Sequence, residues 1–338
     1  MKKGSALSLM LFFWAIVPGF LAFAAVGCIQ AGRLGHSAGL DTIHLKSAAT
    51  QILREALDDN DPRIRAKAVE VIADTRRMEL MPKVMELLID DFVPVRFSAA
   101  VAIGDTGYQP AENAVKHMLE IPDENSRIAA AYAMGKLGSP RHFEIVRRAI
   151  TDKNQTIRAN AAFLLAKIGD KNDLKLLYQA LNDSNSGDKV RFVALDAIAR
   201  LGDDRIFNRL WAIIFSAYAD DRVAGIQAIG ALGTAQAIDV LITKLDDDVL
   251  EVRLAAAEQL GMLGNRTGEP EVLDVLRKNL TAGLDKEETE QIDARTALAI
   301  GRIKTPALMP FLPKFLKSDS KFVRIAAAKA VFQLLLTK

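Results

Sequence analysis

Residues 126–138 read SRIAAAYAMGKLG, and residues 157–169, starting 31 positions later, read IRANAAFLLAKIG. Residues 95–107, which start 31 positions before the first of these stretches, read VRFSAAVAIGDTG. All three have an arginine in second place, small residues in the middle and a glycine at the end. A fixed period of this length is the signature of an array in which each unit packs on its neighbours. This period decides the fold.

The arginine of the motif, called the anchor below, marks nine units between Ser47 and Lys338. The anchors, with an aspartate in this place in unit eight, are Arg65, Arg96, Arg127, Arg158, Arg191, Arg222, Arg253, Asp293 and Arg324. Successive anchors are 31 residues apart, except for spacings of 33 after Arg158 and 40 after Arg253. In units two to seven a glycine lies eleven residues after the anchor, where it can end a helix in the left-handed conformation.

Each unit contains two helical patterns. Leu174, Leu177 and Leu181 illustrate the first, at the spacing of one helix face. Polar residues such as those at 152–154 then form a turn that can cap a second helix, which runs from the anchor to the glycine. We therefore predict an all-α fold, an α-solenoid of about nine helix pairs over residues 47–338.

This pattern resembles HEAT repeats, in the short form of about thirty residues that occurs in the phycobilisome-lyase-like subgroup. The resemblance covers Ser47 to Lys338, and the motif is nearly intact in units two to seven. The signatures of tetratricopeptide and ankyrin repeats are absent. The resemblance implies an α-α superhelix with a concave surface formed by the second helices of the pairs.

Helix geometry predicts a structural role for the anchor arginines. Positions 3, 4, 7 and 8 after the anchor share its helix face and are mostly apolar, so the arginine points inward between units. An aspartate stands two to six residues before most anchors, as Asp61 and Asp152 do. We expect a ladder of arginine–aspartate pairs, because a half-buried arginine needs a partner. The ladder consists of Arg65, Arg96, Arg127, Arg158, Arg191, Arg222, Arg253 and Arg324.

The residues nine positions after the anchor lie on the opposite helix face, which the resemblance implies is the concave lining. They are acidic in the first units, basic in the middle units and partly apolar later. Five positions after the anchor, three consecutive units add an apolar edge. A graded strip of this kind can orient a partner, whereas the alternative is ordinary solvated surface. The candidate partner-binding strip consists of Lys136, Lys167, Arg200, Val101, Tyr132, Phe163 and Met262.

Two irregular features interrupt the array. Unit eight carries nine extra residues near Thr281–Gln291, and we expect this insertion to form a loop, often part of a binding face in repeat proteins. In unit six, Phe207, Trp211, Phe215 and Tyr218 form an aromatic stripe at helical spacing. We interpret the stripe as core, with a role in a binding groove as the alternative.

Composition argues against several classes of function. Lys and Arg total 44 against 42 for Asp and Glu, so the chain has no strong positive electrostatic field that would favour binding of nucleic acid. One cysteine excludes a disulfide framework and a cysteine metal cage. The four histidines form no zinc motif, and no nucleophile has an evident companion. We therefore expect no metal, no cofactor and no enzymatic activity.

The N-terminus has the pattern of an export signal. Lys2 and Lys3 precede an apolar stretch, residues 7–26, that ends in small residues. Cys28 follows Ala25-Val26-Gly27, which resembles the lipobox of bacterial lipoproteins and implies acyl chains such as palmitate on Cys28. We predict a signal peptide at 1–27 and a flexible tether at 28–46. An uncleaved helix in the inner membrane and plain secretion remain as alternatives.

These features lead to one main hypothesis and two alternatives. The main hypothesis is a non-enzymatic scaffold, lipid-anchored in the bacterial cell envelope, monomeric and binding a protein or peptide. One alternative, implied by the subgroup, is a subunit like those of bilin lyases acting on a chromophore protein; an export signal argues against it, because that chemistry is cytoplasmic. The other is an envelope protein that self-associates through its terminal units, since the apolar last helix lacks a polar cap.

Overall fold

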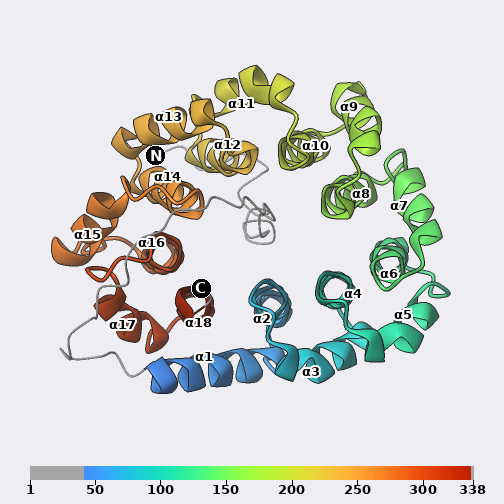
Figure 1. Ribbon diagram of the computed structural model, residues 1–338, viewed down its shortest axis with the longest axis horizontal. Helices are drawn as coiled ribbons and strands as arrows, with labels where there is room; N and C mark the ends of the chain where they lie inside the picture. Colours follow the sequence, from blue (N-terminus) through green and yellow to red (C-terminus); the bar gives the residue numbers. More distant parts are fainter. Residues whose placement is uncertain (1–41, 336–338) are drawn as a thin grey trace, which may run out of the picture.

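The computed structural model describes residues 42–335, and in this range the chain forms eighteen α-helices arranged in two layers of a ring (Figure 1). The inner layer consists of α2 (Pro62–Asp74), α4 (Val93–Thr106), α6 (Glu124–Lys136), α8 (Gln155–Ile168), α10 (Asp188–Arg200), α12 (Ala219–Leu232), α14 (Leu250–Met262), α16 (Lys286–Ile303) and α18 (Lys321–Leu335). The outer layer consists of α1 (Thr42–Leu57), α3 (Met81–Glu86), α5 (Glu112–Met118), α7 (Phe143–Ala149), α9 (Leu174–Asn182), α11 (Phe207–Ile213), α13 (Ala235–Thr243), α15 (Glu269–Arg277) and α17 (Leu312–Leu316). The predicted all-α array of helix pairs is confirmed.

Short polar turns start several inner helices. The Asp123 carboxylate accepts a hydrogen bond from the Ser126 backbone N–H at 2.8 Å, and the Asn154 amide oxygen accepts one from the Thr156 N–H at 2.8 Å. These caps satisfy backbone donors that have no partner inside the helix. Local sequence therefore fixes where these inner helices begin.

In units one to eight, a left-handed residue follows the inner helix eleven positions after the anchor. Gly107 and Gly169 have φ angles of 68° and 83°. The first and eighth units have no glycine there, and Arg76 and Lys304 adopt φ angles of 51° and 57° instead. The left-handed conformation at the helix end thus occurs in these two units as well. It strains the backbone there, because a Cβ atom disfavours this conformation.

A single apolar core runs through the whole ring, from Ala49 in α1 to Phe332 in α18. Neighbouring inner helices approach closely where the sequence has small residues eight positions after the anchor. A Cβ atom added to Gly301 would lie 2.6 Å from the Ala330 Cα atom, and one added to Gly104 would lie 2.8 Å from the Tyr132 ring. The small residues of the motif therefore set the spacing between repeats.

The array closes on itself. The last helix, α18, packs against α1 and α2 of the first repeat, so that the two ends of the array meet in Figure 1. Val331 and Phe332 are buried at this junction, called the seam below. The self-association alternative rested on an apolar last helix without a polar cap, and this end of α18 is largely covered by the same chain.

Two boundaries differ from the sequence-based expectation. The first helix begins at Thr42, inside the segment predicted as a tether, and the insertion of unit eight is only partly a loop. Its second part extends α16, which begins at Lys286 after a capping box formed by Asp285 and Glu288. Local capping chemistry thus converts half of the insertion into helix.

The predictions for the N-terminus concern residues outside the described part of the chain. This applies to the signal peptide, to lipidation of Cys28 and to most of the tether. Among the helices of residues 42–335, none has the length and apolar character needed to cross a membrane.

Candidate functional site in the ring lumen

The anchor arginines join neighbouring repeats on one face of the ring. Arg65 donates two hydrogen bonds of 2.8 Å to the Asp90 carboxylate in the following repeat, and a third to the Asp59 carbonyl oxygen in its own turn. Arg158 reaches Asp183 of the next repeat at 2.8 Å. The partner is thus the aspartate of the next turn, 25 residues downstream, rather than an aspartate of the same turn.

These pairs remain ionised at neutral pH. Partial burial raises the pKa of Asp90, but the Arg65 side chain and the Phe92 backbone N–H outweigh it and leave the pKa below its ordinary value. The hydrogen bond to Asp90 in turn raises the pKa of Arg65.

Three more anchor arginines reach a carboxylate of the next repeat. Arg222 pairs with Asp247 at 2.8 Å, Arg96 lies 3.8 Å from Asp123, and Arg253 pairs with Glu271 at 2.9 Å. Arg127 instead pairs with Glu124 of its own helix. The remaining two, Arg191 and Arg324, donate to backbone carbonyl oxygens of the turn before their own helix.

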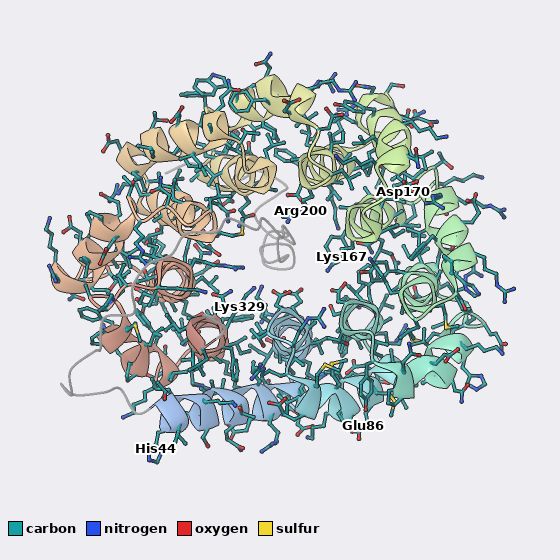
Figure 2. The ribbon with its side chains drawn as sticks, viewed as in Figure 1. His44, Glu86, Lys167, Asp170, Arg200 and Lys329 are labelled. Atoms are coloured by element: carbon teal, nitrogen blue, oxygen red, sulfur yellow. The ribbon has the colours of Figure 1, made fainter. Side chains whose placement is uncertain are left out.

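The residues nine positions after the anchor follow one another around the inner side of the ring, which we call the lumen. Figure 2 shows Lys167 and Arg200 pointing toward the centre of the ring, together with Lys329. The basic part of the predicted strip therefore faces an enclosed lumen rather than an open concave surface.

The acidic and basic parts of the strip neutralise each other. Lys167 of α8 forms an ion pair of 2.6 Å with Asp105 of α4, two repeats away. The Tyr132 hydroxyl of α6 donates to the other oxygen of Asp105 at 2.5 Å. Burial, with help from Asp105, raises the pKa of Tyr132 well above its ordinary value, so this phenol keeps its proton. One carboxylate thus ties three consecutive inner helices together.

Lys136 and Arg200 differ in their surroundings. Arg200 is held by Asp196 of its own helix at 2.6 Å. The Lys136 ammonium lies 5.6 Å from the centre of the Tyr132 ring and 3.5 Å from the Ile168 carbonyl oxygen, and it is exposed. Partial burial lowers the pKa of Lys136. The Asp105 carboxylate opposes this shift, and the positive charge of nearby Lys167 adds to it, so that the pKa lies below its ordinary value. Lys136 is thus a cation able to pair with an anionic group that enters the lumen.

The predicted apolar edge of the strip is mostly unavailable to a partner. Val101 and Tyr132 are 7% and 1% exposed, because residues five positions after the anchor pack between neighbouring inner helices. Phe163 is partly buried, 6.3 Å from the Phe97 ring, and Met262 is also partly buried. The prediction of an exposed apolar edge is wrong for Val101 and Tyr132.

The structure also shows a lumen residue that sequence reasoning missed. Lys329 of α18 is 1% exposed and forms an ion pair of 2.5 Å with Asp74 of α2, across the seam. The signal was present in the sequence: five positions after the anchor, units two to four have Val101, Tyr132 and Phe163, whereas unit nine has a lysine.

The aromatic stripe of unit six lies on the outside of the ring. Trp211 and Phe215 are 41% and 60% exposed, Tyr218 is also exposed, and only Phe207 is buried. The rings of Trp211 and Phe215 are 5.1 Å apart. The interpretation of the stripe as core is wrong for three of its four residues. Outer helix α11 is covered on one side only, which leaves Trp211 exposed, and it ends at Ile213, so Phe215 and Tyr218 lie in the turn before α12.

Metal and nucleophile chemistry has no evident centre in residues 42–335. No group of histidines, cysteines and carboxylates in this range could hold a metal ion. His142 is bound to the Ser139 carbonyl oxygen at 3.0 Å, and His117 lies exposed on α5. The chemistry that the lumen offers is pairing with anions and hydrogen bonding.

Comparison with protein families identifies the repeat. The family model of HEAT repeats matches residues 50–121, 81–159, 111–199, 146–221 and 207–290. These overlapping matches extend over most of the ring. They confirm the resemblance inferred from the anchor motif.

Two curated relatives are phycocyanobilin lyase subunits alpha. The protein of Picosynechococcus sp. is 31% identical over 111 residues, which make up 32% of this chain and 41% of the relative. The protein of Nostoc sp. is 30% identical over 111 residues, 32% of this chain and 40% of the relative. The chain thus matches about two fifths of the length of these relatives.

These relatives correct one expectation. The chain was expected to have no part in enzymatic activity, but both relatives carry the name of a lyase subunit.

Solved structures with a similar fold include human deoxyhypusine hydroxylase, at 17% identity and a TM-score of 0.37, covering 78% of this chain and 99% of that one. The complex of CpcE and CpcF of phycocyanin lyase from Nostoc sp. is matched at 16% identity and a TM-score of 0.31, covering 90% of this chain and 98% of that one. At these scores the likeness carries no argument about function.

Proposed function

Because this chain belongs to the family of HEAT-repeat proteins, we propose that it acts through its ring as a subunit of a bilin-lyase-like system. In this proposal the ring binds a linear tetrapyrrole and presents it to a chromophore protein. The observation that carries the proposal is the 31% identity over 111 residues to a phycocyanobilin lyase subunit alpha. A protein partner is part of the proposal, because both relatives are named as one subunit of a lyase.

The lumen supports the proposal chemically. A linear tetrapyrrole carries propionate carboxylates, and charge-assisted hydrogen bonds from lysine or arginine bind carboxylates strongly. Lys136 is exposed at the lumen and has a lowered pKa, while Lys167 and Arg200 point toward the centre of the ring (Figure 2). Asp105 and Asp196 already neutralise the latter two. We therefore assign the first contact with a carboxylate to Lys136.

The test is a titration of the full chain with phycocyanobilin, followed by visible absorbance and induced circular dichroism. We expect a spectral shift that saturates, and a Kd about tenfold weaker for Lys136→Met, since one lost charge-assisted contact costs about 1.4 kcal/mol. Lys175→Met, which removes an exposed lysine from outer helix α9, is the matched control. The absence of any spectral change would remove pigment binding from the proposal. Equal binding by wild type and Lys136→Met would place the pigment elsewhere on the ring.

The lyase step itself needs a second assay. The pigment-loaded chain is mixed with phycocyanin apoprotein, and covalently attached pigment is read from zinc-enhanced fluorescence after denaturing electrophoresis. We expect attachment or removal of pigment to depend on the chain together with a partner subunit. Pigment binding without any transfer in the presence of candidate partners would reduce the function to pigment carriage.

As a separate proposal, which competes with a lyase role in the cytoplasm, we propose that the protein is held at a membrane of the cell envelope through acyl chains on Cys28. The support is the sequence alone: Lys2, Lys3, the apolar stretch 7–26 and the small residues before Cys28. Intact-mass analysis of the expressed full chain, combined with membrane fractionation, tests this. A chain that starts at Cys28 with added acyl mass is the expected result. A chain that keeps residues 1–27 in the membrane fraction would favour an uncleaved anchor, and a soluble chain would contradict anchoring.

A further inference from the structure

The seam is the one junction of the ring in residues 42–335 that the backbone does not cross. Each of the other neighbouring repeat pairs is joined by a loop of a few residues, such as 75–77 between α2 and the next repeat. A covalent connection keeps neighbouring units close even when their side-chain contacts break. At the seam, by contrast, side-chain contacts alone hold residues that are 255 positions apart.

One contact at the seam is a buried ion pair. Lys329 is buried against Asp74, at the register where units two to four place Val101, Tyr132 and Phe163. Burying two charges costs much of what their attraction returns, so such a pair adds little net stability while both partners are present. The apolar contact that units two to four make at this register is replaced here by a contact that is close to neutral in free energy.

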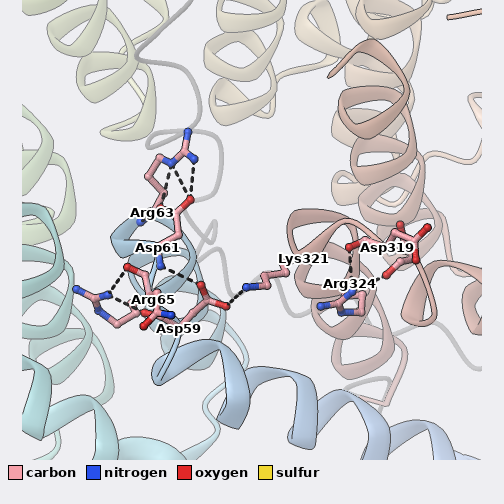
Figure 3. A network of polar contacts seen from close by, with 9 residues as sticks. Asp59, Asp61, Arg63, Arg65, Asp319, Lys321 and Arg324 are labelled. Atoms are coloured by element: carbon pink, nitrogen blue, oxygen red, sulfur yellow. Dashed lines mark hydrogen bonds and ion pairs between the residues drawn. The ribbon is translucent and has the colours of Figure 1, made fainter. Parts of the chain in front are cut away.

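A second polar contact lies at the rim of the seam. Figure 3 shows Lys321 of α18 reaching across to Asp59, beside Asp61 and Arg65 at the start of α2. The Lys321 ammonium is 2.6 Å from the Asp59 carboxylate, and the lysine side chain is 52% exposed. Exposed ion pairs are weak and are screened by salt.

A pocket partly open to solvent lies at the apolar part of the seam. Its volume is about 280 Å³, and it lies between α1, α17 and α18, lined by Leu45, Leu312, Val331 and neighbouring residues. Atoms that border such a pocket have fewer dispersion contacts than atoms in a filled core. Two cation–π contacts, Arg77 over Phe332 at 4.6 Å and Arg63 over Phe322 at 5.9 Å, complete the junction.

From these observations we propose that the ring is a clasp that opens and closes at the seam, with α17 and α18 moving away from α1 and α2. The other junctions stay intact during this motion, because a short stretch of backbone joins the two repeats at each of them. Opening exposes Lys329 and Asp74 and gives lateral access to the lumen. This device does not depend on what the lumen binds.

Distance measurements between two spin labels test the clasp. The full chain is used in a Cys28→Ser background, since Cys28 is its single cysteine. The seam pair is Asn60→Cys with Lys317→Cys, in the turns before α2 and α18. The matched control is Asn60→Cys with Asp91→Cys, which spans the junction between α2 and α4. All three positions are exposed, and none forms a seam contact described above.

We expect the seam pair to gain a second, longer distance when NaCl is raised from about 50 mM to about 1 M, because salt screens the Asp59–Lys321 pair. Lys329→Met should increase this longer component at low salt. The control pair should keep one narrow distribution throughout. A seam distribution that stays single and as narrow as the control under high salt and with Lys329→Met would overturn the proposal, as would a long distance alone under every condition.

The helical signal in circular dichroism shows whether the Lys329→Met variant is still folded. If Lys329→Met loses its helical signal, the salt titration of the otherwise unchanged chain decides the question. In that case an invariant short distance overturns the clasp, and a reversible second distance supports it.

Discussion

Two junctions of the ring, the one built around α6 and the seam at α18, each contain a lumen ion pair but differ in what surrounds it. At α6, Asp105 accepts hydrogen bonds from both Lys167 and Tyr132, and apolar side chains fill the space between helices. At the seam, Asp74 receives Lys329, which itself occupies the position of the apolar filler. The comparison shows that the same chemistry can reinforce one junction and leave another ready to separate, depending on whether apolar packing and backbone connection accompany it.

The largest predicted effect separates these two junctions directly. Lys329→Met leaves the Asp74 carboxylate buried without its partner, which typically costs about 3–5 kcal/mol. Lys167→Met should cost less, roughly 1–3 kcal/mol, because Asp105 keeps the Tyr132 hydroxyl. Urea denaturation of both variants measures the difference. Equal losses would mean that Asp74 depends on Lys329 no more than Asp105 depends on Lys167.

The anchor ladder offers a second contrast. Arg158 is buried and bridges to Asp183 and Ser186 of the next repeat, so Arg158→Ala should lower the free energy of unfolding by roughly 2–3 kcal/mol. Arg127→Ala removes a more exposed pair within one helix and should cost less than about 1 kcal/mol. Thermal unfolding of the two variants checks the order. A larger loss for Arg127→Ala would contradict the bridging role of the ladder.

Small residues between inner helices give a third contrast. A Cβ atom on Gly301 meets the backbone of Ala330, so Gly301→Ala should lower stability by about 1–3 kcal/mol. At the same register, a Cβ on Gly230 meets mainly the flexible Gln259 side chain, which can move away. Gly230→Ala should therefore cost less. Calorimetry of both proteins would show whether backbone proximity, rather than the register, decides the cost.

Protonation of Lys329 should change the equilibrium between the open and the closed seam. Burial lowers the pKa of Lys329 to about 8, against the opposing effect of Asp74 and with further lowering by Arg302 and Lys67, while burial raises the pKa of Glu70. The open seam, with an ordinary lysine, binds this proton more tightly than the closed seam. The free-energy cost of burying the Lys329 charge on closure is therefore fully present below about pH 8. This cost decreases as the pH rises above 8, because the buried lysine then loses its proton.

Between pH 7 and pH 9 the ratio of open to closed rings should fall about tenfold, in the direction that proton linkage requires. The longer component of the spin-label distances reports this ratio, and Lys329→Met should abolish its pH dependence. A ratio that rises with pH would mean that loss of the attraction to Asp74 outweighs relief from the buried charge.

The smallest effect concerns the helix ends of units one and eight. Arg76 and Lys304 adopt the left-handed conformation that glycine supplies in the units between them. Arg76→Gly and Lys304→Gly should each raise the free energy of unfolding by about 1 kcal/mol, because the strain of the Cβ atom disappears. Unfolding curves would show this gain. Gly107→Lys, the reverse change in an interior repeat, should cost a similar amount.

Much of the fold follows from the sequence because the information is local. The 31-residue period, the caps at Asp123 and Asn154 and the glycine at position 107 each act within one or two turns of helix. The register that places Lys136, Lys167 and Arg200 on one side is also local, since it depends on the rotation per residue in a helix. These features needed no knowledge of how one repeat stacks on the next.

The tertiary structure decided which of those helix faces are buried, which line the lumen and which are exposed. A small rotation at each repeat adds up over nine repeats to a full turn, roughly 40° each, and helix periodicity does not contain that angle. Closure converts a concave strip into a lumen and brings Lys329 to Asp74. Packing between repeats buries Tyr132, while the one-sided cover of α11 leaves Trp211 exposed. The sequence determined the helices and their faces, and the accumulated geometry of packing determined which faces meet.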